Sequence, residues 1–219
     1  MKSLDTISIV AKKLAPGREP TFLEAHVIAA LRIVSREATI GRSNLSRTLG
    51  LSEGTTRTLI KHLRREDVFE VTRSGIVLSK LGRQLLSELE SKISNEIEVP
   101  KSPLTVGEHN LASLVRQAAG AVAYGLEQRD MAIKAGAMGA TTLVYRSSKL
   151  AMPGTDENVF QDTQPIRELL ISKLKPREND VVIIGSADSR LSAEIGALAA
   201  ALGLLRIKES KQTNPLQSH

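Results

Sequence analysis

Residues 40–86 read IGRSNLSRTLGLSEGTTRTLIKHLRREDVFEVTRSGIVLSKLGRQLL. Apolar residues recur at helical spacing in two short segments, and Gly50 between them supplies the backbone freedom that a helix C-terminus needs. Two β-rich runs, 68–72 and 76–79, follow with Arg73, Ser74 and Gly75 between them, which is the pattern of a tight hairpin. This stretch therefore predicts a short helix, a turn, a second helix, a hairpin and a third helix.

The second of these helices, expected over about 53–66, has two unlike faces. Thr56, Leu59, Ile60 and Leu63 have the spacing of a buried stripe, and Ser52 is a suitable N-cap. The opposite face is basic. The second helix of a helix-turn-helix enters the DNA major groove, so we expect eight side chains of this region to contact DNA: Arg42, Ser43, Arg47, Thr55, Arg57, Thr58, Lys61 and Arg73.

Within that set, Arg57 is expected to read a base because its guanidinium can pair with guanine. Arg42, Ser43 and Arg47 on the preceding helix are expected to contact phosphates. Arg73 at the hairpin tip is expected to enter the minor groove or to contact phosphate. The alternative interpretation is a basic helix face that is merely solvated.

Further helices are expected on both sides of this region. Thr21 and Glu24 match a capping box at the start of a helix that ends near Glu37. After the hairpin, Ser79 is expected to cap a helix that leads to a dimer partner or the next domain, or that packs within its own module. Its apolar stripe consists of Leu81, Leu85, Leu86, Leu89 and Ile93.

The composition excludes several classes of function. Aromatic residues make up 2% of the 219 residues, which argues against the stacking platforms of single-strand binders. The chain has no cysteine, so disulfides, thiolate zinc sites and cysteine nucleophiles are excluded. We find no apolar run approaching eighteen residues and no cleavable leader, and therefore expect a cytoplasmic protein without membrane segments. No metal or cofactor is expected.

Charge is distributed unevenly along the chain. Residues 1–95 contain 16 Lys and Arg against 10 Asp and Glu, whereas residues 96–219 contain 14 of each kind. The whole net charge of +6 therefore belongs to the part that contains the helix-turn-helix pattern. A basic module joined to a neutral one is typical of a nucleic-acid reader attached to a second domain.

Residues 96–219 predict a domain of mixed strands and helices. Strands are expected at 141–145, pairing with 149–152, and at 180–185, and helices at 123–135, 165–173 and 189–204. This order favours an α+β or α/β domain with its sheet covered on at least one face. We therefore expect an α+β protein of two domains, 1–95 for DNA binding and 96–219 for ligand sensing or dimerisation.

Two groups of residues in this second domain are candidates for a small-ligand site. The first follows the expected strand at the start of a helix, where free amides favour an anion: Gly185, Ser186, Asp188, Ser189 and Arg190. The second is polar sequence beside Ala- and Gly-rich stretches: His109, Glu127, Arg129 and Asp130. The alternatives are that Ser186 or Asp188 simply caps the helix, and that the second group is a solvated ion-pair face.

Residues 40–86 resemble the winged-helix transcriptional regulators of archaea and bacteria. The resemblance rests on the Leu-Ser-x-x-Thr-Thr-Arg-x-Leu-Ile-x-x-Leu helix from Leu51 and the Leu-Ser-x-x-Gly-x-x-Leu-Leu ending from Leu78. The whole chain is similar to an archaeal group that joins a winged helix to a C-terminal domain of unknown function. The segments behind this likeness are 125–130, 139–143 and 184–196.

These observations favour a DNA-binding transcriptional regulator over an enzyme. We expect double-stranded DNA as a partner, a homodimer, and a small anionic effector or an assembly role for the second domain. Two alternatives stay open at this point. One is an enzyme acting on a phosphorylated or anionic metabolite at residues 185–190, and the other is a protein-interaction scaffold.

Overall fold

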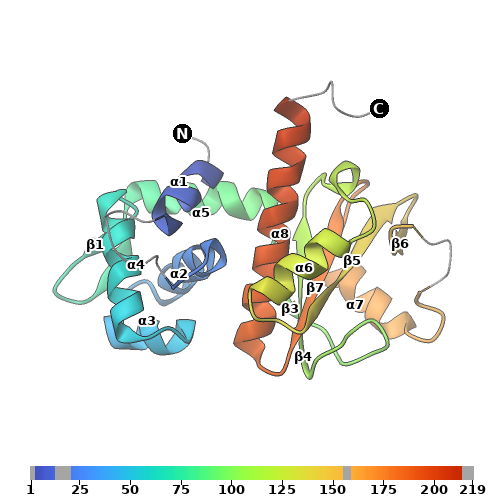
Figure 1. Cartoon of the computed structure of the whole chain (residues 1–219), viewed down its shortest axis with the longest axis horizontal. Helices are drawn as coiled ribbons and strands as arrows, with labels where there is room; N and C mark the ends of the chain where they lie inside the picture. The colour runs from blue at the N-terminus through green and yellow to red at the C-terminus, as the bar shows by residue number, and fades with distance from the viewer. Residues whose placement is uncertain (1–2, 13–20, 155–158, 214–219) are drawn as a thin grey trace. The chain divides into compact units, whose positions relative to one another are not determined.

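The computed structural model describes residues 3–12, 21–154 and 159–213 (Figure 1). The chain divides into two compact units, Met1–Glu90 and Ser91–His219, and each is described by itself. Among the described residues, no helix is long and apolar enough to cross a membrane.

The N-terminal unit contains the helices and the hairpin in the order that residues 40–86 predict. It consists of α1 (Ser3–Ala11), α2 (Glu24–Glu37), α3 (Arg42–Leu49), α4 (Glu53–Arg65), β1 (Phe69–Val71), β2 (Ile76–Leu78) and most of α5 (Lys80–Lys92). The strands are antiparallel, with Phe69 opposite Leu78 and Val71 opposite Ile76.

The turn between α3 and α4 uses the residues that the sequence indicates. Gly50 adopts a left-handed conformation (φ 62°), and its amide donates to the carbonyl of Arg47. The Oγ of Ser52 then accepts a hydrogen bond from the amide of Thr55 at 3.1 Å, which caps α4. Thr56, Leu59, Ile60 and Leu63 are all buried, as expected.

The predicted capping box of α2 is wrong. The helix starts at Glu24, and the residue that returns to the N-cap is His26, whose Nδ1 accepts a hydrogen bond from the amide of Leu23 at 3.0 Å. His26 at the third helical position therefore takes the part that Glu or Gln takes in a capping box. The hydroxyl of Thr21 lies instead 2.8 Å from the hydroxyl of Thr55.

The helix after the hairpin follows its prediction except at one position. Ser79 Oγ accepts from the amide of Gly82 at 2.9 Å and caps α5. Leu85, Leu86 and Leu89 of the expected stripe are buried, as is Ile93 just beyond the helix, but Leu81 is 45% exposed. Leu81 lies in the first turn, where the chain has only just left the hairpin, so it does not reach the core.

The C-terminal unit is an antiparallel sheet with helices on both faces. Its strand order is β3-β4-β7-β5-β6, and every neighbouring pair is antiparallel, which makes the domain α+β. In chain order the elements are β3 (Ile97–Glu98), β4 (His109–Val115), η1 (Ala119–Ala121), α6 (Leu126–Lys134), β5 (Gly139–Arg146), β6 (Lys149–Ala151), α7 (Gln164–Leu174), β7 (Val181–Ala187) and α8 (Arg190–Thr213).

Strand β7 lies at the centre of the sheet and is buried along its whole length. Val182 and Ile184 face a core that includes Phe160 and Leu170 of the α7 side. Because side chains alternate along a strand, Gly185 faces the other side, where α8 and α6 pack. The expected helices at 123–135 and 189–204 are present, but α6 begins at Leu126 and α8 continues to Thr213.

Candidate nucleic-acid interface

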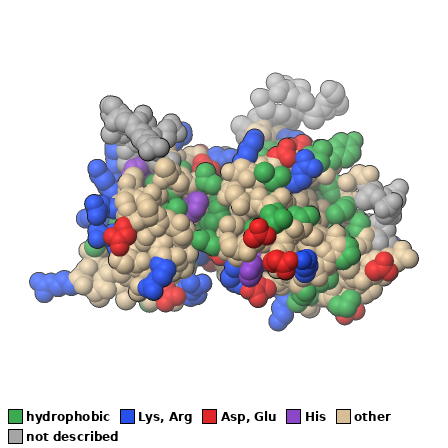
Figure 2. All heavy atoms as spheres, turned by 60° about the horizontal axis from the view of Figure 1, so that its bottom comes forward, with side chains coloured by type: hydrophobic (Ala, Val, Ile, Leu, Met, Phe, Trp, Pro, Cys, Tyr) green, Lys and Arg blue, Asp and Glu red, His purple; other side chains and the backbone are tan. Residues whose placement is uncertain are grey.

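A groove lies between α4 and the β1–β2 hairpin of the N-terminal unit. Its volume is about 530 Å³. Among the described residues, five that line it are cations: Arg42, Arg57, Lys61, Arg64 and Arg65. The others are the apolar Ile60, Val71 and Ile76, and no carboxylate is among them. At the left of Figure 2, Lys and Arg side chains gather along the edge of this unit. A concave surface with charges of one sign concentrates the field that attracts phosphates.

The groove is basic because α4 is strongly two-sided. Thr56, Leu59 and Leu63 are buried on its inner face, so the intervening Arg57 and Lys61 have to point outward and are exposed. His62 also lies on the inner face, with Nδ1 2.7 Å from the carbonyl of Val10. Its burial gives it a structural part in the unit.

The structure brings together three of the predicted DNA contacts. Arg42, Arg57 and Lys61 all line the groove. Two further cations there, Arg64 and Arg65, were not in the predicted set. They occupy the last turn of α4, and their position beside the hairpin depends on the turn after the helix, which helical spacing alone does not give.

The predicted hydroxyl contacts are engaged within the unit. Ser43 Oγ donates to the carboxylate of Glu53 at 3.2 Å. Thr55 Oγ1 accepts from Ser52 Oγ at 2.9 Å, in addition to its contact with Thr21. Thr58 Oγ1 donates to the carbonyl of Gly54 at 3.1 Å. These hydroxyls therefore support the start of α4 in the unbound protein.

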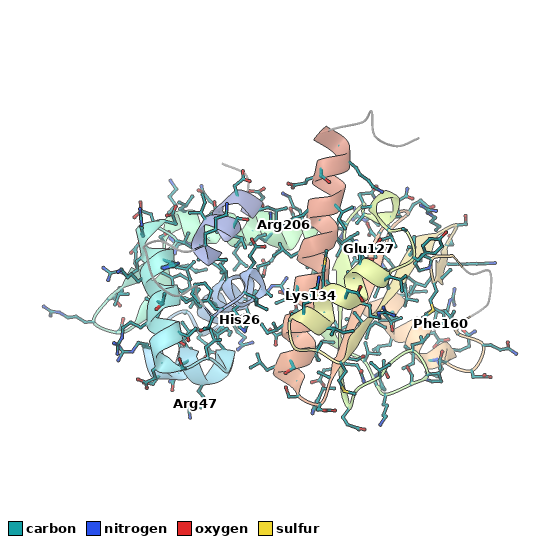
Figure 3. All side chains as sticks on the ribbon, in the orientation of Figure 1. His26, Arg47, Glu127, Lys134, Phe160 and Arg206 are labelled. Carbon is teal, nitrogen blue, oxygen red and sulfur yellow. The ribbon has the colours of Figure 1, made fainter. Side chains whose placement is uncertain are left out.

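Arg47 and Arg73 lie outside the lining of the groove. Arg47, on α3, points away from the helices in Figure 3 and donates to the side-chain oxygen of Asn44. Arg73 is exposed at the tip of the hairpin. Their positions leave both side chains accessible to a duplex that is larger than the groove itself.

In the C-terminal unit, the residues of the expected anion site differ in exposure, because the first two are buried and the last three are exposed. Gly185 and Ser186 are inside β7 and buried. A Cβ on Gly185 would lie 2.4 Å from the carbonyl oxygen of Ala193 in α8, so the absence of a side chain there allows the helix to pack closely on the sheet. Ser186 Oγ is buried without a hydrogen-bond partner among the residues that the structure describes.

The exposed end of that segment caps a helix and carries an ion pair. Ser189 Oγ accepts from the amide of Ser192 at 3.1 Å, so Ser189, rather than Ser186 or Asp188, caps α8. Arg190 is paired with the carboxylate of Glu98 on β3. An anion would have to compete with that carboxylate for the guanidinium.

The second expected group does not form one site with the first. Of the second group, His109 lies near residues 185–190, because it pairs in register with Ala187 at the end of β7. Glu127, Arg129 and Asp130 instead lie on the exposed face of α6. There the Nη2 of Arg129 is 3.1 Å from Oδ1 of Asp130, as expected for a solvated ion-pair face.

Comparisons with known proteins find separate matches for two parts of the chain. Residues 27–93 match the family described as CggR N-terminal DNA binding domain. Residues 106–205 match the family described as Domain of unknown function (DUF4443). No curated protein matches the chain. The resemblance to a DNA-binding regulator joined to a domain of unknown function is thereby confirmed.

A solved structure has a similar fold. It is a hypothetical protein from Pyrococcus horikoshii OT3, with a TM-score of 0.66 and 23% sequence identity over 89% of this chain and 96% of that chain. The similar structure thus comes from an archaeon, and the match extends over both units. At this identity it supports the fold alone.

Proposed function

We propose that the chain is a cytoplasmic, homodimeric transcriptional regulator whose N-terminal unit binds double-stranded DNA as a winged helix. The observation that carries this proposal is the groove of five cations between α4 and the hairpin, on a unit that matches a DNA-binding domain family. In this arrangement α4 enters the major groove, Arg57 reads a base edge, and the surrounding cations contact phosphates.

A dimer would extend this recognition to two half-sites. Helices of a twofold dimer bind sites about 34–36 Å apart or multiples of that distance, so the operator would be palindromic. We propose assembly as the main part of the C-terminal unit. A role in sensing an anionic effector has less support, because Gly185 packs against α8 and Arg190 already pairs with Glu98.

The proposal can be tested by selecting genomic DNA with the purified full-length protein at two salt concentrations and sequencing the bound fragments. We expect a palindrome with two half-sites that is retained at the higher salt. Recovery that is independent of sequence and lost with salt would indicate a general DNA binder. No recovery at either salt would contradict DNA binding and favour the interaction scaffold.

A matched pair of variants ties the result to the groove. Arg57→Ala combined with Lys61→Ala should abolish selection. Lys173→Ala, an exposed cation on α7, should leave the recovered sequences unchanged.

A further inference from the structure

The exposed apolar side chains of the C-terminal unit gather around one helix. Among its described residues, five large hydrophobic side chains are exposed, and all lie on α6 or close to it in the chain or in space: Val106, Tyr124, Leu126, Ile133 and Met138. Tyr124 precedes α6 in the chain and Met138 follows it, and Val106 Cγ2 lies 3.3 Å from the place that a Cβ on Gly139 would take. Such clustering marks an interaction surface, whereas isolated exposed hydrophobic residues do not.

On α6 itself, the apolar residues form a stripe. Leu126 is 51% and Ile133 is 47% exposed, and their spacing of seven residues places them on the same face, two turns apart. Gln128 and Ala132 are buried on the opposite face, where α6 packs against α8 and β5. The stripe therefore points away from the core of its own unit.

Two side chains of opposite charge lie beside the stripe and have the same spacing as Leu126 and Ile133. Glu127 and Lys134 are also seven residues apart and share one flank, near the two ends of α6 (Figure 3). Both are exposed. Between them, Arg129 and Asp130 are paired with each other, so they add no net charge to the middle of the face.

This pattern is self-complementary under a twofold axis perpendicular to the helix. Such an axis runs a second α6 antiparallel to the first and places the same flanks together. Leu126 then meets Ile133 of the second copy, and Glu127 meets its Lys134. The first pairing centres between Arg129 and Asp130 and the second between Asp130 and Met131, so the two centres are one residue, about 1.5 Å, apart along the helix and lie on either side of Asp130. A partner of one uniform charge would match only half of this face.

We propose that α6 is the homodimer interface of this protein, packed antiparallel against α6 of a second copy. The proposal rests on the dimer of the proposed function and names the surface that forms it. Helices packed face to face lie about 8–10 Å apart, which allows the apolar stripes to contact directly. One helix and its flanking residues make a small interface, so we expect dissociation in the micromolar range.

The first experiment is a charge exchange, read by sedimentation equilibrium of the full-length protein over a range of concentrations. Glu127→Lys and Lys134→Glu each place like charges opposite one another twice in the dimer, and each should raise the dissociation constant about tenfold. The double variant restores opposite charges and should return to within about threefold of wild type. A structural role of either side chain within its own unit would not produce this restoration.

The second experiment uses the absence of cysteine from the chain. Asp130→Cys places one thiol next to the proposed axis, where the Cα atoms of two facing helices come within disulfide reach. This variant should form a covalent dimer under mild oxidation. Glu168→Cys on the exposed surface of α7 is the matched control, and it should remain uncrosslinked.

Two outcomes would overturn the proposal. A monomeric protein at all concentrations would do so, and would also remove the dimer from the proposed function. A stable dimer that ignores the charge exchange and does not crosslink through Asp130→Cys would place the interface elsewhere. That result would leave DNA binding, which the genomic selection measures separately, unaffected.

Discussion

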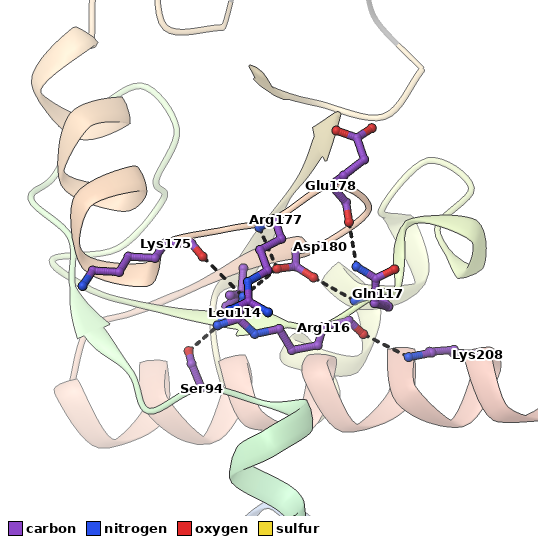
Figure 4. A network of polar contacts seen from close by, with 9 residues as sticks. All are labelled: Ser94, Leu114, Arg116, Gln117, Lys175, Arg177, Glu178, Asp180 and Lys208. Atoms are coloured by element: carbon purple, nitrogen blue, oxygen red, sulfur yellow. Dashed lines mark hydrogen bonds and ion pairs between the residues drawn. The ribbon is translucent and has the colours of Figure 1, made fainter. Parts of the chain in front are cut away.

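Arg116 donates a hydrogen bond from Nη1 to Oδ2 of Asp180 over 2.7 Å, and this carboxylate is fully buried. The amides of Gln117 and Arg177 also donate to Asp180, at 2.9 and 2.8 Å (Figure 4). Lys208 of α8 donates to the carbonyl of Arg116 at 3.0 Å. One carboxylate at the start of β7 thereby joins the ends of two neighbouring strands, and α8 is attached to them through Arg116.

Asp180→Ala should destabilise the C-terminal unit by about 3 kcal/mol, because it removes a buried carboxylate that accepts hydrogen bonds from Arg116 and from the amides of Gln117 and Arg177. Arg116→Ala should cost less, about 1 kcal/mol, since the carboxylate keeps its two amide donors and the arginine is 34% exposed. Hydrogen exchange of the β7 amides measures both effects within the unit. Equal losses would show that the ion pair, rather than the amides, stabilises the carboxylate.

Gly185→Ala should destabilise the same unit by at least about 2 kcal/mol, because the new methyl group would overlap the backbone of α8. Gly120→Ala is the matched control, since a methyl group added there would have nothing within 4 Å of it. Urea unfolding followed by circular dichroism compares the two. An unchanged unfolding midpoint for Gly185→Ala would reopen this glycine as a point of ligand approach.

Lowering the pH should destabilise the N-terminal unit through His26. Burial disfavours the imidazolium and lowers the pKa of His26 below its ordinary value of 6.5. The unfolded chain therefore binds the proton first, so the stabilisation is complete above pH 6.5 and is lost as the pH falls through the folded pKa. Protonation also removes the acceptor for the amide of Leu23.

The variant His26→Gln tests this assignment, because glutamine at the third helical position can still accept from the N-cap amide but does not titrate. Unfolding of this variant between about pH 7.5 and 5.0 should depend less on pH than that of wild type. The same pH dependence in both proteins would assign the effect to another group.

Arg57→Ala should weaken DNA binding selectively at one base position, by about 1–3 kcal/mol for the preferred sequence. Arg47→Ala should weaken binding to all sequences alike and reduce the salt dependence by about one unit of slope, as loss of a phosphate contact does. Titrations of the selected operator and of single-base variants at several salt concentrations separate the two. Equal loss on every sequence for Arg57→Ala would contradict its role in base reading.

Local signals in the sequence were sufficient for most of the N-terminal unit. Gly50, Ser52, Gly75 and Ser79 act through bonds to residues a few positions away, so their effects can be read without tertiary structure. The start of α2 could not be read in this way. The capping-box pattern at Thr21 was available, but Thr21 contacts Thr55 across the unit, and His26 supplies the cap instead.

In the candidate interface too, the sequence predicted some features and only the structure showed the others. Helical spacing was enough to place Arg57 and Lys61 on the outer face of α4, because the inner positions are mostly apolar. It could not show that Arg64 and Arg65 border the hairpin, or that Ser43 and Thr55 are engaged in hydrogen bonds within the unit.

The sequence by itself determined the order of helices and strands in residues 40–86, the basic character of the first unit and the mixture of helices and strands in the second. These properties depend on periodicity, on caps and turns, and on where charge lies along the chain. Only the tertiary structure decided that β7 lies at the centre of an antiparallel sheet, that Gly185 faces α8, and that Arg190 pairs with Glu98. Contacts of this kind join residues far apart in the chain, and their choice depends on how whole elements pack.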